Sequence, residues 1–242
     1  EVLRTLPGLN VKDYGGIGGM KTVSVRGLGA NHTSVCVDGM LVNDAQHGSI
    51  DLSGFDLDDT GNILVETVSA GGIFKPARAY SSGSVISLAT KAPDLGGKTA
   101  RLSARMVYGS FGTLKPTIRF DGKLADGWVV TARGSYLKSN GNYPFGYDGL
   151  SGERINLRRE GSDVSAFKSL LRLEGNTHKG GVLRASASYS GSERGIPGPV
   201  ILYVLDPTER IWNKDLSSVV TYESAKGLSL WHYRIGGSYR RT

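Results

Sequence analysis

The chain has 242 residues with 35 glycines, 8 prolines, one cysteine and a formal charge of +7. Glycine is about twice as frequent as the usual 7% or so, which favours a turn-rich β protein over a disordered one. No apolar run reaches the roughly 18 residues of a membrane-spanning helix, although strands closed into a barrel are also compatible with a membrane. The single cysteine, Cys36, excludes an internal disulfide, and its place between two valines predicts a small buried residue.

Short apolar runs separated by glycines and acid–glycine pairs fill the segment from Met20 to Lys91. Val23-Ser-Val25 leads to Gly27, and Val35-Cys-Val37 leads to Asp38-Gly39, which is typical of short strands closed by tight turns. The acidic cluster Asp56-Leu-Asp-Asp59 differs from a calcium loop in its later positions. It predicts an N-cap before a short helix.

Together with the later runs Ile63–Val68 and Ala79–Lys91, these pieces resemble, in this order, the plug domain of TonB-dependent outer-membrane receptors. The resemblance includes Leu3-Arg-Thr-Leu-Pro-Gly-Leu-Asn-Val11, which is similar to the family's short helix and proline-glycine turn. It implies a mixed α/β plug domain over residues 1–95. The resemblance also implies that the N-terminal part is missing, because the family's energy-coupling segment precedes its plug and is absent here.

The charge distribution changes near Pro93-Asp-Leu-Gly-Gly97. The first 99 residues carry 8 of the 29 basic and 10 of the 22 acidic residues, so their net charge is −2 and that of the remainder is +9. We take this change as the domain boundary. A thin, glycine-rich N-terminal domain would fit best inside a structure that covers its surface.

Beyond the boundary, apolar and polar residues alternate with a period of two, as in Arg101-Leu-Ser-Ala-Arg-Met-Val-Tyr108. Such alternation predicts strands with one apolar and one polar face. Each segment is close to the 9–11 residues with which a tilted strand crosses a bilayer. The segments are 101–108, 113–124, 128–138, 163–174, 183–189, 214–224 and 228–240. The basic residues of the polar face are Arg105, Lys115, Arg119, Arg133, Lys168, Arg172, Arg184 and Arg234.

A soluble β-sandwich would show the same alternation, but two observations favour a membrane barrel. After a first hairpin at Gly109-Ser-Phe-Gly112, connections alternate between short (125–127, 175–180, 225–227) and long (139–161, 191–213), as in barrels with short inner turns and long outer loops. Most aromatic residues of the apolar face fall near segment ends, as in an interfacial girdle. The aromatic residues of this face are Tyr108, Phe120, Trp128, Tyr136, Phe167, Tyr189, Tyr222, Trp231 and Tyr239.

Residues 98–242 are therefore expected to form the first seven or so strands of an antiparallel transmembrane β-barrel that is incomplete here. The plugged barrels of about 22 strands would need roughly 440 residues at the spacing in this chain. The sequence is accordingly interpreted as an internal fragment.

No catalytic constellation is found, and no cofactor is expected. The four histidines lack metal-ligand spacing, so no metal site is predicted. Basic and aromatic residues lie on opposite strand faces, which argues against a nucleic-acid-binding groove. The basic face is expected to line a lumen, where it meets the acidic plug or attracts anionic solutes.

The resemblance implies a receptor of the bacterial outer membrane for energy-coupled uptake of a scarce solute: a siderophore-bound iron, haem, cobalamin or, less often, a glycan. Its partners would be membrane lipid, the small solute and the TonB complex, the last through a segment absent from this chain. The alternative from another class is a secreted or surface β-rich binding or adhesion module that uses the long loops.

Two sets of residues are candidates for sites. Loops 12–20, 29–33 and 43–49 are expected at the outer apex of the plug, where a ligand would meet aromatic and hydrogen-bonding groups. The apex set is Tyr14, His32, Asp44, Gln46 and His47. Arg26 and Glu66 match charged positions of the family's plug and are expected to contact the barrel.

Overall fold

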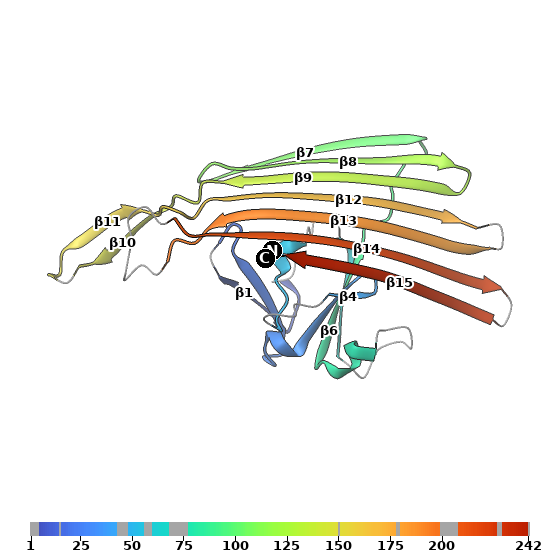
Figure 1. Ribbon diagram of the computed structural model, residues 1–242, viewed down its shortest axis with the longest axis horizontal. Coiled ribbons are helices and arrows are strands. Elements are labelled where there is room, and N and C mark those ends of the chain that lie inside the picture. The colour runs from blue at the N-terminus through green and yellow to red at the C-terminus, as the bar shows by residue number, and fades with distance from the viewer. Residues whose placement is uncertain are drawn as a thin grey trace. The chain divides into compact units, whose positions relative to one another are not determined.

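The computed structural model describes residues 5–14, 16–42, 48–55, 60–67, 77–149, 151–177, 180–198, 208–226 and 229–241 (Figure 1). The chain divides into two compact units, Glu1–Pro93 and Asp94–Thr242. Within the described residues, no helix is long and apolar enough to cross a membrane.

The first unit contains a hairpin and a four-stranded mixed sheet. The hairpin joins β1 (Leu9–Tyr14) to β2 (Met20–Val25), which pair antiparallel. The mixed sheet has the order β4-β3-β6-β5, in which β3 and β6 are parallel. Its strands are β3 (Thr33–Val37), β4 (Met40–Val42), β5 (Thr60–Thr67) and β6 (Ser84–Thr90). The core of this unit is small: Val23, Val25, Val35, Ile50, Leu52, Ile86 and Leu88. Cys36 is buried, as the sequence predicts.

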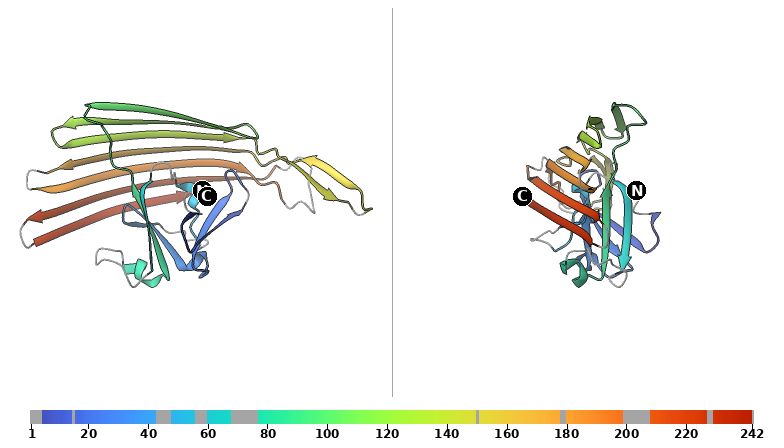
Figure 2. Two further views of the ribbon diagram at one scale, coloured as in Figure 1. Left: turned by 180° about the vertical axis from the view of Figure 1, so that it is seen from behind. Right: turned by 90° about the vertical axis from the view of Figure 1, so that its right-hand side faces the viewer.

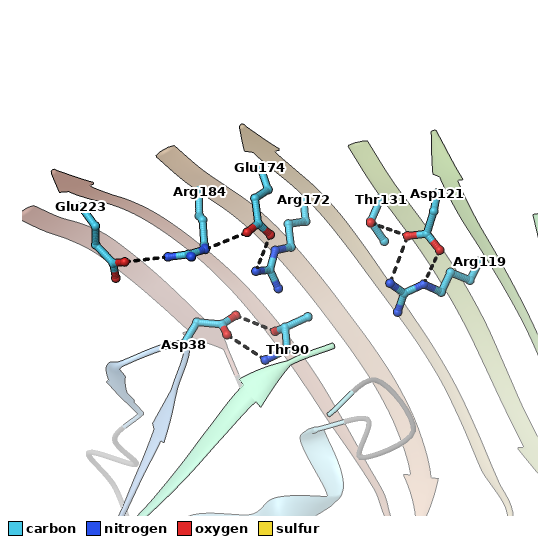
Figure 3. A network of polar contacts seen from close by, with 9 residues as sticks. All are labelled: Asp38, Thr90, Arg119, Asp121, Thr131, Arg172, Glu174, Arg184 and Glu223. Carbon is cyan, nitrogen blue, oxygen red and sulfur yellow. Dashed lines mark hydrogen bonds and ion pairs between the residues drawn. The ribbon is translucent and has the colours of Figure 1, made fainter. Parts of the chain in front are cut away.

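Two tight turns of this unit confirm the turns predicted from the glycines. Arg26 and Gly27 have φ values of 51° and 75°, and Asp38 and Gly39 have φ values of 47° and 75°. Consecutive left-handed residues are the signature of a type I′ turn. The Asp38 side chain also accepts hydrogen bonds from the backbone N–H and the hydroxyl of Thr90 at 2.8 and 2.6 Å (Figure 3). This contact joins the β3–β4 turn to the end of β6.

The helical part of the mixed α/β prediction is wrong for the described residues of this unit. The helical elements of this unit are 3₁₀ turns of three to five residues in the described part of the chain: η2 (Ala30–His32), η3 (Leu52–Gly54) and η6 (Ala77–Ser81). The segment after the acidic cluster is strand β5 rather than a helix, because its Ile63-Leu-Val65 run pairs with β6. Residues 56–59 lie outside the described residues, and so do residues 1–4 of the predicted N-terminal helix.

The second unit is a seven-stranded antiparallel sheet in the order β15-β14-β13-β12-β9-β8-β7. Figure 2 shows its strands side by side in a single layer. The strands are β7 (Ala100–Gly109), β8 (Thr113–Ala125), β9 (Trp128–Ser139), β12 (Val164–Asn176), β13 (Gly181–Gly195), β14 (Arg210–Lys226) and β15 (Ser229–Arg241). A strand occupies each of the seven segments in which alternation predicts one. β13 and β14 are longer than predicted, at 15 and 17 residues.

The two ends of this sheet differ in their connections. The turn end has the short links 126–127, 177–180 and 227–228, whereas the loop end has one short link, 110–112, and the long links 140–163 and 196–209. The first long link contains a hairpin that the sequence does not predict, formed by β10 (Pro144–Asp148) and β11 (Arg154–Arg158). This hairpin extends beyond the loop end of the sheet in Figures 1 and 2.

The pairing register divides the sheet into two chemically different faces. One row across the strands reads Leu102, Phe120, Ala132, Leu171 and Ala187. These residues and their period-two neighbours make up the apolar face, and the alternate residues make up the polar face. Leu102 is 71% exposed, Met106 64% and Ile235 77%. The apolar face of the sheet is therefore not covered by other parts of the second unit.

Candidate functional site

Ion pairs organise the polar face of the sheet. On β8, the Arg119 guanidinium makes two contacts with the Asp121 carboxylate, Nε to Oδ2 at 2.8 Å and Nη2 to Oδ1 at 3.0 Å. The Thr131 hydroxyl on β9 donates to Asp121 Oδ1 at 2.6 Å. Asp121 and Thr131 are only 3% and 1% exposed. The carboxylate is therefore held by three charge-assisted or hydroxyl donors.

A second group of ion pairs crosses three strands of the same face. Arg172 Nη2 on β12 lies 2.9 Å from Glu174 Oε2. Arg184 on β13 joins Glu174 to Glu223 on β14, with contacts of 3.0 and 3.1 Å (Figure 3). The four charges alternate in sign, so each charge faces an opposite one. Such pairing offsets the cost of removing charges from water.

The alternating pattern predicts the basic residues of this face, but their acidic partners are not among the predicted residues. The signal is present in the sequence: Asp121 follows Arg119 by two residues, and Glu174 follows Arg172 by two. Residues two apart on a strand share a face. An Arg-x-Asp or Arg-x-Glu spacing within an alternating strand therefore indicates a pair on one face.

The apolar face has aromatic residues at both ends. Trp128, Tyr222 and Tyr233 share one row at the turn end, where the rings of Tyr222 and Tyr233 stack at 6.5 Å between centroids. Tyr136 and Phe167 share a row at the loop end. On β9 the two rows are eight residues apart, which corresponds to about 27 Å along the strand. For a strand tilted by about 40° from the bilayer normal, the rows are separated by about 20 Å along that normal. This height is close to the apolar band of about 25 Å on membrane barrels.

Aromatic side chains also gather on the β10–β11 hairpin. Phe145 contacts both Tyr143 and Tyr147, with centroids 6.5 and 6.4 Å apart, and Tyr143 contacts Phe111 at 6.2 Å. The Arg159 guanidinium carbon lies 5.7 Å from the centre of the Phe145 ring. The loop end therefore carries rings and a cation, groups that can bind a planar or anionic solute.

Three charges connect β12, β13 and β14 at the loop end. Arg210 Nη2 lies 2.7 Å from Asp163 Oδ2, and Arg210 Nε lies 2.5 Å from Glu193 Oε1. The hydrogen bond from the Arg210 guanidinium holds the pKa of the Asp163 carboxyl below its ordinary value of 3.8, whereas partial burial acts in the opposite direction. The folded state therefore binds the Asp163 proton less readily than the unfolded state.

We expect the Asp163 contribution to stability to depend on pH. A lowered pKa adds stability that is present above 3.8 and disappears as the pH falls through the folded-state pKa. The melting temperature of Asp163→Asn should therefore lie below that of the wild type at neutral pH, and the two should converge at a pH well below 3.8. Asp148→Asn, which alters an exposed pair with Arg154, is the control. A difference between Asp163→Asn and the wild type that is constant with pH would contradict this expectation.

Two residues of the predicted apex set lie in the described part of the chain, and the structure places them at exposed positions. Tyr14 ends β1 and is 54% exposed. His32 ends η2 and is exposed. The connections that carry them lie at opposite ends of β2, so the hairpin does not bring the two side chains together. Asp44, Gln46 and His47 lie outside the described residues.

The predicted plug–barrel pair lies on two different elements of the first unit. Arg26 is exposed in the left-handed turn after β2, and its backbone N–H donates to Gly8 O at 2.8 Å. Glu66 is half-buried on β5 opposite Val85. A non-glycine residue in the left-handed region is uncommon, and such residues concentrate at functional sites.

No group of three or more His, Cys, Asp or Glu side chains is placed to hold a metal ion in the part of the chain that the structure describes.

Comparison with known proteins gives matches to each unit. The family model "TonB-dependent Receptor Plug Domain" matches residues 1–76. The curated vitamin B12 transporter BtuB of Vibrio vulnificus (strain YJ016) is 40% identical over 52 residues, which are 22% of this chain and 8% of that protein.

Solved structures match nearly the whole chain in fold. The copper transporter OprC aligns over 99% of this chain and 33% of its own, with a TM-score of 0.69 and 14% identity. The FrpB iron transporter of Neisseria meningitidis aligns over 98% and 37%, with a TM-score of 0.70 and 13% identity. The ferric citrate transporter FecA aligns over 99% and 36%, with a TM-score of 0.66 and 19% identity. The chain spans about a third of the length of these three proteins.

Proposed function

Because the chain belongs to the TonB-dependent receptors, whose plug domain matches its residues 1–76, we propose that it comprises the plug and the first barrel strands of an outer-membrane uptake receptor. Residues 1–95 form the plug, and residues 98–242 supply about seven strands of the transmembrane barrel. TonB-dependent receptors are outer-membrane proteins of Gram-negative bacteria, and the matched relatives are transporters and receptors rather than enzymes.

One combination of features carries the proposal: a plug-type domain is followed by an antiparallel sheet whose exposed face is apolar between two aromatic rows. A soluble protein rarely exposes such a continuous apolar face. A lipid bilayer is a suitable environment for this apolar face, because the backbone groups are hydrogen-bonded within the sheet and the apolar side chains contact hydrocarbon. The polar face, with its ion pairs, then lines the interior.

The solute belongs to the class taken up at low concentration with energy from the TonB complex. The relatives are named for vitamin B12, copper, iron and ferric citrate. We propose the iron-siderophore, haem or cobalamin class, which is the class that the family resemblance implies. The positive net charge of the barrel strands favours an anionic complex. The partners are the small solute, outer-membrane lipid and the TonB complex.

Extraction separates this function from the rival one, a secreted β-rich adhesion module. We expect the full-length protein to stay in the outer-membrane fraction through high salt and to need detergent for release. In detergent it should migrate differently before and after heating, as a folded barrel does. Release in buffer alone would support the adhesion module and overturn the receptor.

The proposed ligand site is on the plug loops, with Tyr14, His32, Asp44, Gln46 and His47 as its candidate residues. Tyr14 and His32 lie at opposite ends of β2, so only one of them belongs to the same contact surface for a small solute. We expect replacement of Tyr14 and His47 together by alanine to weaken solute binding tenfold or more, equivalent to about 1.4 kcal/mol. Equilibrium binding to the inserted receptor measures the effect. The control is Tyr80→Ala, because Tyr80 is a 40%-exposed tyrosine of the same unit. Wild-type affinity in the double variant would place the site on the loop end of the barrel instead.

Arg26 and Glu66 are proposed to hold the plug against the barrel wall. The left-handed Arg26 backbone supports this role, since that conformation suits glycine better than arginine. In the full-length receptor, Arg26→Ala should loosen the plug and raise its protease sensitivity and the pore conductance, without loss of barrel assembly. Arg26→Lys, which keeps the charge, should change the protease sensitivity and the pore conductance less than Arg26→Ala does. If pore conductance and protease protection of the plug in Arg26→Ala equal those of the wild type, Arg26 is a solvated surface residue that does not hold the plug.

A further inference from the structure

Charged residues of the apolar face are concentrated at one end of the sheet, among the residues that the structure describes. At the loop end they are Lys138, Glu193, Arg210, Lys214 and Arg241. At the turn end one lysine, Lys226, takes a position of the apolar face opposite Ser229, and the other positions of this face are apolar, aromatic or small. A charge distribution of this kind suits a membrane whose two leaflets differ in headgroup charge.

Glu193, the acidic residue of this set, is already paired with Arg210. Arg210 contacts both Glu193 and Asp163. Lys138, Lys214 and Arg241 make no ion pair within the described part of the chain. Three cations at the edge of an apolar surface therefore remain available to an external anion.

Lys214 and Arg241 form the centre of this surface. They lie directly opposite each other on β14 and β15. Like charges at directly opposed positions destabilise a sheet, unless an anion lies between them. Their row neighbours toward the turn end, Leu216 and Tyr239, are 52% and 62% exposed. The cation pair therefore borders the apolar band, at the level where lipid headgroups begin.

We propose that Lys214 and Arg241 bind the phosphate of a phosphorylated glycolipid in the outer leaflet. This inference rests on the proposed function, which places the loop end outside. The position next to the apolar band favours a lipid phosphate over a dissolved one, because the lipid's chains lie along the apolar face while its phosphate meets the two cations. The guanidinium and ammonium groups supply the charge-assisted hydrogen bonds that phosphate accepts.

The test is a titration of the full-length receptor, in neutral detergent, with diphosphoryl lipid A. We expect the dissociation constant to rise fivefold or more in Lys214→Gln/Arg241→Gln, and binding by the wild type to weaken with salt. The matched control is Arg154→Gln/Arg158→Gln, which removes the same charge from the β10–β11 hairpin and should bind like the wild type. Lys214→Arg, which keeps the charge, should retain binding.

The inference is wrong if Lys214→Gln/Arg241→Gln binds diphosphoryl lipid A as tightly as the wild type does. It is also wrong if the control variant Arg154→Gln/Arg158→Gln loses as much affinity as Lys214→Gln/Arg241→Gln. A third contradicting result is that the wild type binds phosphatidylglycerol as tightly as diphosphoryl lipid A. A shift of electrophoretic mobility on heating is measured on every variant. Loss of that shift in the wild type itself would count against the barrel, and hence against the proposed function, rather than against the lipid site alone.

Discussion

Replacing Leu171 with arginine is expected to destabilise the membrane-inserted receptor by about 2–4 kcal/mol, the cost of a cation on the lipid face near the bilayer midplane. Leu171 lies midway along β12 on the apolar face and is 55% exposed in the sheet. In a bilayer this exposed surface meets hydrocarbon. The free energy of unfolding from lipid vesicles in urea measures the effect.

The adjacent residue provides the matched control. Leu170 is half-buried on the polar face, opposite Arg133 on one side and Ser188 on the other. Leu170→Arg introduces a like charge next to Arg133, which costs about 0.2–1 kcal/mol. A water-soluble sheet would give the reverse order, since replacing an exposed leucine is nearly neutral and replacing a half-buried one is not. A larger loss for Leu170→Arg than for Leu171→Arg would contradict the membrane assignment.

Asp121→Ala is expected to cost the barrel about 3 kcal/mol. Loss of one member of a buried ion pair costs about 3–5 kcal/mol, and we take the lower value because water reaches the interior of a barrel. The substitution removes the carboxylate that holds two nitrogen atoms of Arg119 and the hydroxyl of Thr131. Urea unfolding and heat-dependent mobility of the full-length receptor measure the loss.

Two other variants show whether the effect belongs to the buried pair. Asp121→Asn keeps an acceptor for Thr131 and should lose less stability than Asp121→Ala. Asp126→Ala removes the carboxylate of the exposed Lys123–Asp126 contact at the β8–β9 turn and should change stability little, because exposed pairs contribute little. Similar losses in Asp121→Ala and Asp126→Ala would mean that the ion pair on the polar face does not support the sheet.

The sheet is predictable from the sequence because its signal is local and repeated. A period of two in segments such as 101–108 specifies a strand and also decides which residues share a face. The type I′ turns are predictable for the same reason, since Asp38-Gly39 between two apolar runs has few other conformations.

What the sequence does not predict depends on contacts between distant segments. The region 60–67 forms strand β5 because it pairs with β6, which is distant in the sequence. The helix predicted from the acidic cluster before it is therefore wrong. Each strand of the β10–β11 hairpin has only five residues, so although Ile155 and Leu157 alternate with polar residues, the signal is too short to reveal its pairing within a long loop. The Glu174–Arg184–Glu223 contacts require the register of three strands.

The central claim, that the apolar face contacts lipid and the polar face contacts water, can be measured directly with spin labels. Single cysteines at Leu171 and Leu170, in a Cys36→Ser background of the full-length receptor, carry a nitroxide in lipid vesicles. We expect the label at 171 to be relaxed strongly by oxygen, which partitions into hydrocarbon, and weakly by a water-soluble nickel chelate, with weaker oxygen relaxation at 170. Strong relaxation by the nickel chelate at 171, equal to or above that at 170, would contradict the account.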